Sequence, residues 1–74
     1  MEKKILEANE ALKSKKYDEA ILIYQEILKT NDVAEIHFNL GLVLKIQNKL
    51  DAAEASFSKA ISLKSDFVFA HYQL

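Results

Sequence analysis

Short polar clusters interrupt the chain at regular intervals, and this punctuation limits what the sequence can fold into. They fall at residues 14–16, 30–32, 47–49 and 64–66. The segments between them are about 12 to 14 residues long, an ordinary length for a globular helix and too long for an ordinary strand. They are rich in Ala, Leu, Glu and Lys, which favour helices. We predict five helices, over residues 2–14, 18–30, 33–47, 51–64 and 67–74.

The apolar residues within these segments recur with helical spacing. Short connections require consecutive helices to run antiparallel. Acidic residues Asp18, Asp32 and Asp51 stand before or within predicted first turns, where a carboxylate meets unpaired N–H groups and the positive end of the helix dipole. The predicted core stripes are Ala20, Tyr24, Ile27 and Leu28; Ile36, Leu40, Val43 and Leu44; and Ala53, Phe57, Ala60 and Ile61.

The composition excludes several classes of protein. The 74 residues include no Cys, which rules out disulfides and thiolate metal sites, and they also include no Pro. The net charge is -1, whereas a nucleic-acid binder usually carries a basic excess, so we expect no nucleic-acid partner. No apolar run approaches the roughly 20 residues that span a bilayer. We therefore expect no membrane partner and a cytoplasmic location.

The chain repeats itself with a period close to 34 residues. Residues 37–40, His-Phe-Asn-Leu, recur 34 positions later as His-Tyr-Gln-Leu at 71–74. Ala20, Tyr24 and Ile27 recur 33 positions later as Ala53, Phe57 and Ala60. Two helices in each period indicate stacked helical hairpins.

These residues resemble the tetratricopeptide repeat, whose pattern is W-x2-L-G-x2-Y followed by A-x3-F-x2-A and often Pro. The second repeat has Leu40-Gly41, then Ala53, Phe57 and Ala60, while His37 replaces the Trp and Leu44 the Tyr. The first repeat keeps Ala20 and Tyr24 but has Ala8 in place of Gly, and both lack the Pro. The resemblance implies an all-α fold of two stacked antiparallel hairpins, an α-solenoid, with a short C-terminal helix. The repeats would span residues 1–33 and 34–67, and a third repeat or capping helix would occupy 68–74.

Tetratricopeptide arrays bind peptides on a concave face lined by the first helix of each repeat. The resemblance therefore implies a non-catalytic interaction module, with a protein or peptide partner that offers an apolar segment. A competing hypothesis is that Leu42, Ile46, Phe69 and Tyr72 only pack on neighbouring helices. The implied peptide-binding groove contains Ile5, Asn9, Leu12, Phe38, Asn39, Leu42, Ile46, Phe69, Tyr72 and Gln73, with Glu35 beside it.

Other site chemistries are disfavoured. Both histidines, His37 and His71, stand where the family packs its Trp, so we expect packing roles for them. A zinc site would need three or four ligands. We predict no catalytic residue, no metal and no cofactor. The carboxylate-binding subtype of the family is also unlike this chain, because Ile5, Phe69 and Gln73 replace its basic residues although Asn9 and Asn39 match.

Two alternatives to peptide binding stay open. The chain ends in closely spaced large apolar residues, which favours a homodimer through that end. Alternatively, the sequence is the N-terminal part of a larger tetratricopeptide protein whose activity lies elsewhere. The predicted self-association residues are Phe67, Phe69, Tyr72 and Leu74.

Overall fold

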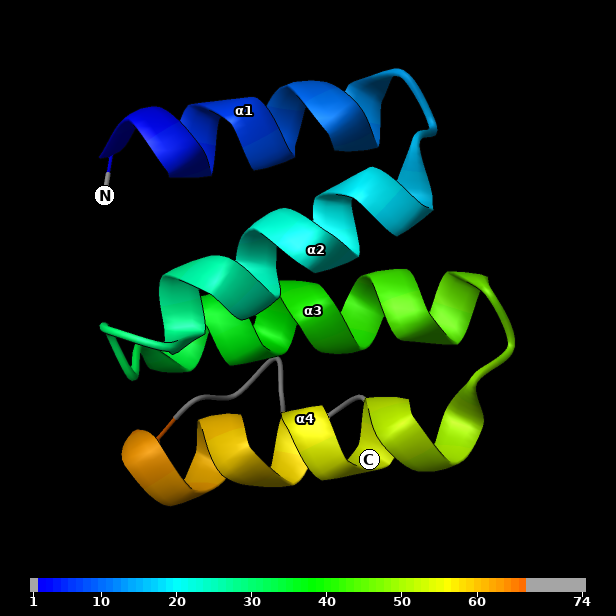
Figure 1. The fold of residues 1–74 in the computed structure, drawn as a ribbon. Coiled ribbons are helices and arrows are strands. Elements are labelled where there is room, and N and C mark those ends of the chain that lie inside the picture. Colours follow the sequence, from blue (N-terminus) through cyan, green and yellow to red (C-terminus); the bar gives the residue numbers. More distant parts are fainter. Residues whose placement is uncertain (1, 67–74) are drawn as a thin grey trace.

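The computed structural model describes residues 2–66, and they form four α-helices (Figure 1). The all-α prediction is confirmed, and each predicted boundary of these helices lies within two residues of the observed one. The fifth helix, predicted over 67–74, lies outside the described residues. The helices are α1 (Glu2–Lys13), α2 (Tyr17–Leu28), α3 (Ala34–Ile46) and α4 (Leu50–Leu63).

Consecutive helices run antiparallel and lie side by side (Figure 1). The extensive contacts are those of α1 with α2, of α2 with α3, and of α3 with α4. The architecture is therefore two helical hairpins, α1–α2 and α3–α4, that stack through α2 and α3. The helices α1 and α3 both pack on α2 and point in the same direction.

The helices after the first begin without side-chain capping hydrogen bonds. Their N-cap residues are Lys16, Val33 and Lys49, and none of these makes such a bond. Asp18 and Asp51 lie in the first turns of α2 and α4, as predicted, where their charge favours the helix dipole. Most of the stability of such helices comes from packing of their apolar sides.

The two hairpin turns have the same backbone conformation at the end of the preceding helix. After α1, Lys15 has φ 60°, and after α3, Asn48 has φ 62°. In each turn the next residue closes the helix: the Lys16 N–H donates to the Ala11 carbonyl at 2.8 Å, and the Lys49 N–H to the Leu44 carbonyl at 2.9 Å. This is the Schellman arrangement, which places a left-handed residue directly after the helix. Asn tolerates that conformation better than Lys does.

The left-handed Lys15 makes the first turn a site for stabilisation. We expect Lys15→Gly to raise the free energy of unfolding by about 0.5 to 1 kcal/mol, because Gly adopts positive φ without the steric cost. The matched change, Asn48→Gly, should have a smaller effect because Asn already tolerates this conformation. Urea unfolding of the three proteins measures both effects. A Lys15→Gly protein no more stable than the parent would contradict the assignment of strain to this turn.

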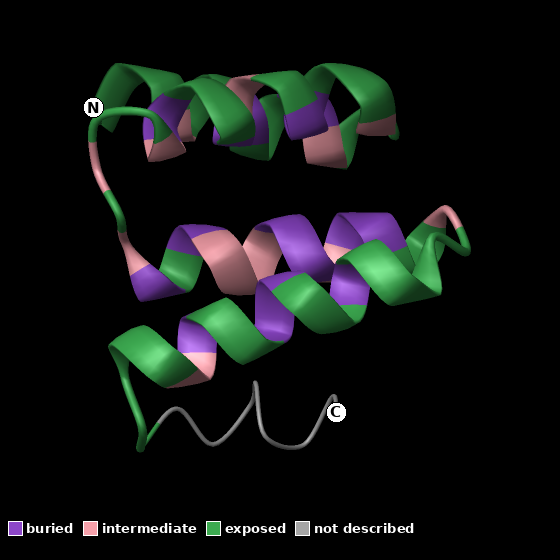
Figure 2. Ribbon diagram, turned by 60° about the horizontal axis from the view of Figure 1, so that its bottom comes forward, coloured by how far each residue is buried: buried purple, intermediate pink, exposed green. Residues whose placement is uncertain are grey.

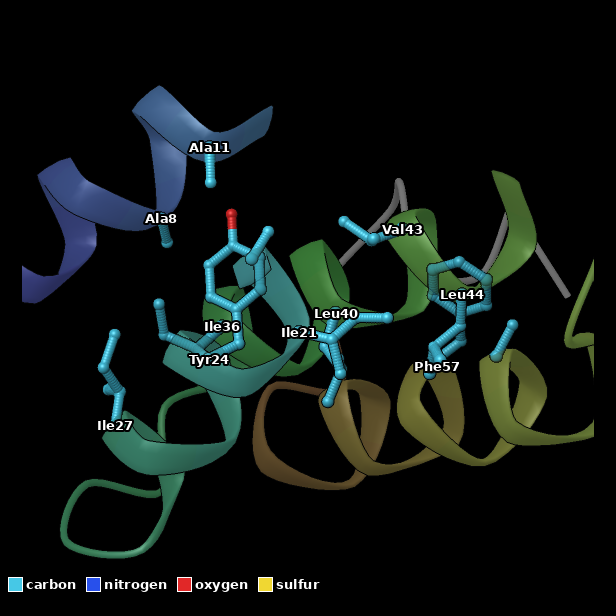
Figure 3. Close-up of a cluster of buried hydrophobic side chains, with 12 residues drawn as sticks. Ala8, Ala11, Ile21, Tyr24, Ile27, Ile36, Leu40, Val43, Leu44 and Phe57 are labelled. Carbon is cyan, nitrogen blue, oxygen red and sulfur yellow. The ribbon is translucent and has the colours of Figure 1, made fainter. Parts of the chain in front are cut away.

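The core lies between the helices, and the buried residues face inward from all four (Figure 2). Tyr24 is the largest fully buried side chain. Its ring extends from α2 toward α1, with the hydroxyl near Ala8 and Ala11 (Figure 3). Small residues on α1 thus leave room for a large one on α2. The buried core cluster contains Ala8, Ala11, Ala20, Ile21, Tyr24, Ile27, Ile36, Leu40, Val43, Leu44, Ala53 and Phe57.

Gly41 brings α3 close to α4, as the sequence predicted. A Cβ atom at this position would lie 2.6 Å from Cε1 of Phe57, which is nearer than real Cβ contacts allow. Phe57 is 2% exposed, and its ring centroid lies 5.7 Å from that of Phe38 at a tilt of 52°. The absence of a side chain at Gly41 therefore provides the space that the Phe57 ring occupies.

The outer side of α1 differs from the equivalent side of α3. Glu7 and Glu10 of α1 are exposed, whereas Leu40 and Val43, 33 positions later in each case, are buried. The α3 side chains pack inward because α2 and α4 lie against them.

Candidate functional site

The predicted groove residues of the described chain lie on α1 and α3, and we call this set the A-helix face. On α1, Ile5 and Leu12 are half-buried against the core, and Asn9 is exposed. The other predicted groove residues, Phe69, Tyr72 and Gln73, lie outside the described residues, as does the whole predicted self-association patch. The A-helix face consists of Ile5, Asn9, Leu12, Phe38, Asn39, Leu42 and Ile46.

The α3 helix carries apolar side chains outside its core stripe as well as within it. Phe38, Leu42 and Ile46 follow one another at intervals of four residues, so they share one side of the helix. Phe38 and Leu42 are half-buried, and Ile46 is 59% exposed. A helix that is apolar on all sides is unusual at a protein surface. This side of α3 is consequently the most apolar part of the A-helix face.

Phe38 belongs partly to the core. Its ring packs on Phe57 of α4, so only part of its surface is available to a ligand. Leu42 also contacts the core with part of its side chain. The side chain that offers most apolar surface is Ile46, near the end of α3.

The polar residue of α3 on this face is Asn39, which is half-buried. Burial raises the pKa of Tyr24, and the Asn39 amide acts in the opposite direction. The Tyr24 phenol is therefore neutral at ordinary pH. The Tyr24 hydroxyl is buried and completes no hydrogen bond with the described residues.

Ion pairs tie the start of α3 to its neighbours. The His37 Nε2 lies 2.7 Å from Asp32 Oδ1, and Lys59 Nζ lies 3.6 Å from Asp32 Oδ2. Lys64 Nζ donates to Glu35 Oε2 at 3.3 Å. The His37 side chain is 13% exposed, which agrees with the packing role predicted for it. Asp32, which the sequence placed near a first turn, precedes α3 and binds these side chains instead of capping the helix.

The Asp32 pairs predict a dependence of stability on pH. The hydrogen bond from His37 is the main cause that lowers the pKa of the Asp32 carboxyl, and the Lys59 charge adds to it. A carboxylate with a lowered folded pKa stabilises the fold above its unfolded pKa of about 3.9 and loses that effect as the pH falls. We expect the urea midpoint of the parent to fall from pH 5 to pH 3 more than that of Asp32→Asn. Equal slopes for the parent and Asp32→Asn would refute the role of Asp32.

The structure has a hollow of about 430 Å³ away from the A-helix face, between the start of α1 and the end of α2. The Lys4–Glu26 ion pair, 2.7 Å long, lies at its edge. Of the predicted groove residues that the structure describes, none lines it. The lining residues are Lys4, Glu26, Ile27, Lys29, Thr30 and Asn31.

Among residues 2–66, no cluster of three or more His, Cys, Asp or Glu side chains could hold a metal ion.

Within that same range, no helix combines the length and apolarity needed to cross a membrane.

A family model of the tetratricopeptide repeat matches residues 34–67, the segment that contains α3 and α4. Residues 34–67 are a tetratricopeptide repeat. The match includes Gly41 and Phe57, whose close contact joins the two helices of the repeat. Tetratricopeptide repeats are in general protein–protein interaction modules, typically without catalytic activity. The assignment of residues 1–33 to a first repeat and of 68–74 to a third stays a prediction.

A search of curated proteins found no match to the chain.

Sequence reasoning missed the polar contacts of this region, and two of them differ in whether the sequence offered a signal. The Gln47 side chain donates to Asp18 Oδ1 at 2.9 Å, which joins the end of α3 to the start of α2 across the hairpins. The Asp32–His37 contact spans the start of α3. A signal for the second was available, because an acid just before a helix and a base in its first turns are often neighbours. The first had none, since the two residues are 29 positions apart.

Proposed function

We propose that the chain is a non-catalytic interaction module that binds an apolar protein segment on its A-helix face. The repeat at residues 34–67 supports an interaction role in general. The location of the binding site is our inference. It rests on α3, where Phe38 and Leu42 at the border of the core continue into the exposed Ile46 on one side of the helix.

The comparison between helices supports this location. Exposed large apolar residues on the other helices stand among polar neighbours, as Leu22 does on α2 beside Asp18 and Gln25. Scattered single residues of that kind are normal on protein surfaces and need no partner. On α3 three apolar side chains share one side, which is the pattern of a surface that a partner covers.

The polar groups of the face suit a peptide backbone. Asn9 and Asn39 carry neutral amides, which both donate and accept hydrogen bonds. An uncharged segment with apolar side chains would therefore find contacts for its side chains on α3 and for its backbone at the amides. We propose such a segment, extended or helical, as the ligand class.

Selection from a phage library of random dodecapeptides, panned on the intact chain, tests the proposal. Bound peptides should be enriched in Leu, Ile, Val and aromatic residues. Ile46→Lys should weaken the binding of a selected peptide about tenfold or more, because it replaces an apolar contact worth roughly 1.5 to 3 kcal/mol when fully buried. Its urea midpoint should barely change, since Ile46 is 59% exposed.

The matched control is Leu22→Lys, at a side chain that is 65% exposed on α2 and outside the A-helix face. It should leave peptide affinity unchanged. Equal affinities of the two variants would place the binding surface elsewhere, and a failure to select any peptide would contradict the proposed ligand class.

A further inference from the structure

Half of the lysines of the chain lie at one end of the structure. Five of the ten fall within residues 13–16 and 45–49, which include the turn between α1 and α2 and the turn between α3 and α4. Both turns lie at the same end of the helices (Figure 1). The Gln47 side chain, which donates to Asp18 Oδ1 at 2.9 Å, connects them. We call this surface the basic end, and its exposed lysines are Lys13, Lys15, Lys16, Lys45 and Lys49.

The lysines of the basic end outnumber its acids. Residues 13–19 and 45–51 contain five lysines and three carboxylates, whereas the whole chain has a net charge of -1. Away from this end, Lys4, Lys59 and Lys64 each pair with a carboxylate. The positive charge that is left for a partner is therefore concentrated at the basic end. Its lysines that form no ion pair within residues 2–66 are Lys13, Lys15, Lys16 and Lys49.

Three of these lysines occupy positions that the local structure disfavours. Lys15 has φ 60°, a conformation that suits Gly better. Lys16 and Lys49 are the N-cap residues of α2 and α4, where a positive charge meets the positive end of the helix dipole. Lysines elsewhere on the surface would serve solubility equally well. Neither solubility nor folding therefore accounts for the placement of these three charges.

Exposed apolar side chains flank the second turn. Ile46 at the end of α3 is 59% exposed, and Leu50 at the start of α4 is 56% exposed. Ile46 belongs to the A-helix face, whereas Leu50 lies outside it. A partner that covers the basic end must therefore bring apolar side chains as well as negative charge.

We propose that the basic end binds an acidic protein segment, in which Asp or Glu residues are interspersed with large apolar ones. Its carboxylates bind Lys15, Lys16 and Lys49, and its apolar side chains pack on Leu50. A short segment is favoured over a nucleic acid or an anionic bilayer, because those extended polyanions would also face the rest of the chain, which is acidic. This binding does not depend on the A-helix face.

Titration of the intact, isotope-labelled chain with a dodecapeptide of alternating Glu and Leu residues, followed by nuclear magnetic resonance, tests the proposal. The backbone amide signals of residues 13–19 and 45–51 should shift most. Raising the NaCl concentration from about 50 to about 500 mM should weaken the binding about tenfold, because salt screens exposed charges. A peptide of alternating Lys and Leu should not shift these signals. Absence of binding by the Glu-Leu peptide, or shifts mainly outside these residues, would overturn the proposal.

Two single variants separate binding from folding. Lys15→Gly should weaken the binding of the Glu-Leu peptide about threefold although it raises the urea midpoint, so the two properties should change in opposite directions. Leu50→Gln should weaken the binding about threefold by removing an apolar contact. Unchanged affinity in Lys15→Gly would overturn the contact with that charge, and unchanged affinity in Leu50→Gln would overturn the apolar part of the proposal.

A pair of double variants tests whether the position of the charge matters. Lys16→Gln combined with Lys49→Gln should weaken the binding about tenfold. The matched control, Lys3→Gln combined with Lys29→Gln, removes two exposed lysines from the opposite end and should keep the parental affinity. Equal affinities of the two double variants would overturn the proposal.

Other anions distinguish the class of partner. Phosphatidylcholine vesicles with about 30% phosphatidylserine, and an oligothymidylate of the same length as the peptide, should both bind the chain more weakly than the Glu-Leu peptide does. Equal or tighter binding of either one, lost in the Lys16→Gln, Lys49→Gln variant, would assign the basic end to a membrane surface or a nucleic acid and overturn the acidic protein segment.

Discussion

Phe57→Ala is expected to leave the chain largely unfolded at 25 °C. Phe57 is 2% exposed, packs on Phe38 and occupies the space above Gly41. Truncation of such a ring costs about 3 to 5 kcal/mol through lost burial and the cavity that remains. The core of a domain below about 80 residues rarely supplies more than about 3 to 5 kcal/mol. Circular dichroism should therefore show loss of most helical signal at low urea concentration.

Two variants separate the cavity effect from a general sensitivity of α4. Phe57→Leu keeps most of the volume and should cost less than about 1.5 kcal/mol. Leu63→Ala removes an apolar side chain that is 41% exposed on the same helix and should cost less still. A cooperative urea transition of Phe57→Ala at the parental midpoint would show that this ring does not hold the two helices together.

Gly41→Val should destabilise the chain by about 3 kcal/mol, at the upper end of the usual cost of overpacking. The new Cβ would stand 2.6 Å from Cε1 of Phe57, a buried ring that Phe38 prevents from moving away on one side. Gly41→Ala should lose less, about 1 kcal/mol net, because the better helix propensity of Ala offsets part of the clash. Urea unfolding gives both values.

The clash can be relieved by shortening its other partner. In a Phe57→Leu background the ring is gone, so Gly41→Ala should be neutral or stabilising, as it is in helices where space exists. A double-mutant cycle measures this interaction directly. Additive losses would mean that Gly41 matters for a reason other than its contact with Phe57.

The helices and the core stripe of α3 could be predicted because both depend on local information. Regular polar breaks mark the turns, and a spacing of three and four residues marks the buried side of each helix. Ile36, Leu40, Val43 and Leu44 are all buried, as that spacing predicts. The close approach at Gly41 followed from the family pattern, and the structure supplies its cause in the ring of Phe57.

The side-chain contacts between hairpins could not be predicted in the same way. Phe38 shows the difficulty: the family resemblance placed it on the groove side, but it lies at the border of two faces and packs on Phe57. Residues at such a border turn toward whichever neighbour offers space, and that neighbour is far away in the sequence. The positive φ of Lys15 could not be predicted either, because Lys rarely adopts this conformation. Asn48 in the equivalent turn is a residue type that does.

The stacking of each helix mainly on its immediate neighbours in sequence also determines how the chain loses its structure. Within residues 2–66, α1 makes its extensive contacts with α2, whereas α2 and α3 each have a packed helix on both sides. In such a linear arrangement each unit is coupled to the next one, and opening can begin at an end without disturbing the middle. Backbone amides of α1 can therefore exchange with solvent through partial opening, whereas exchange of those in α2 and α3 requires a larger part of the molecule to open. A partner that binds across α1 and α3 would slow amide exchange in α1 toward the rates of α2 and α3. Ligand binding should therefore change the exchange rates of α1 most.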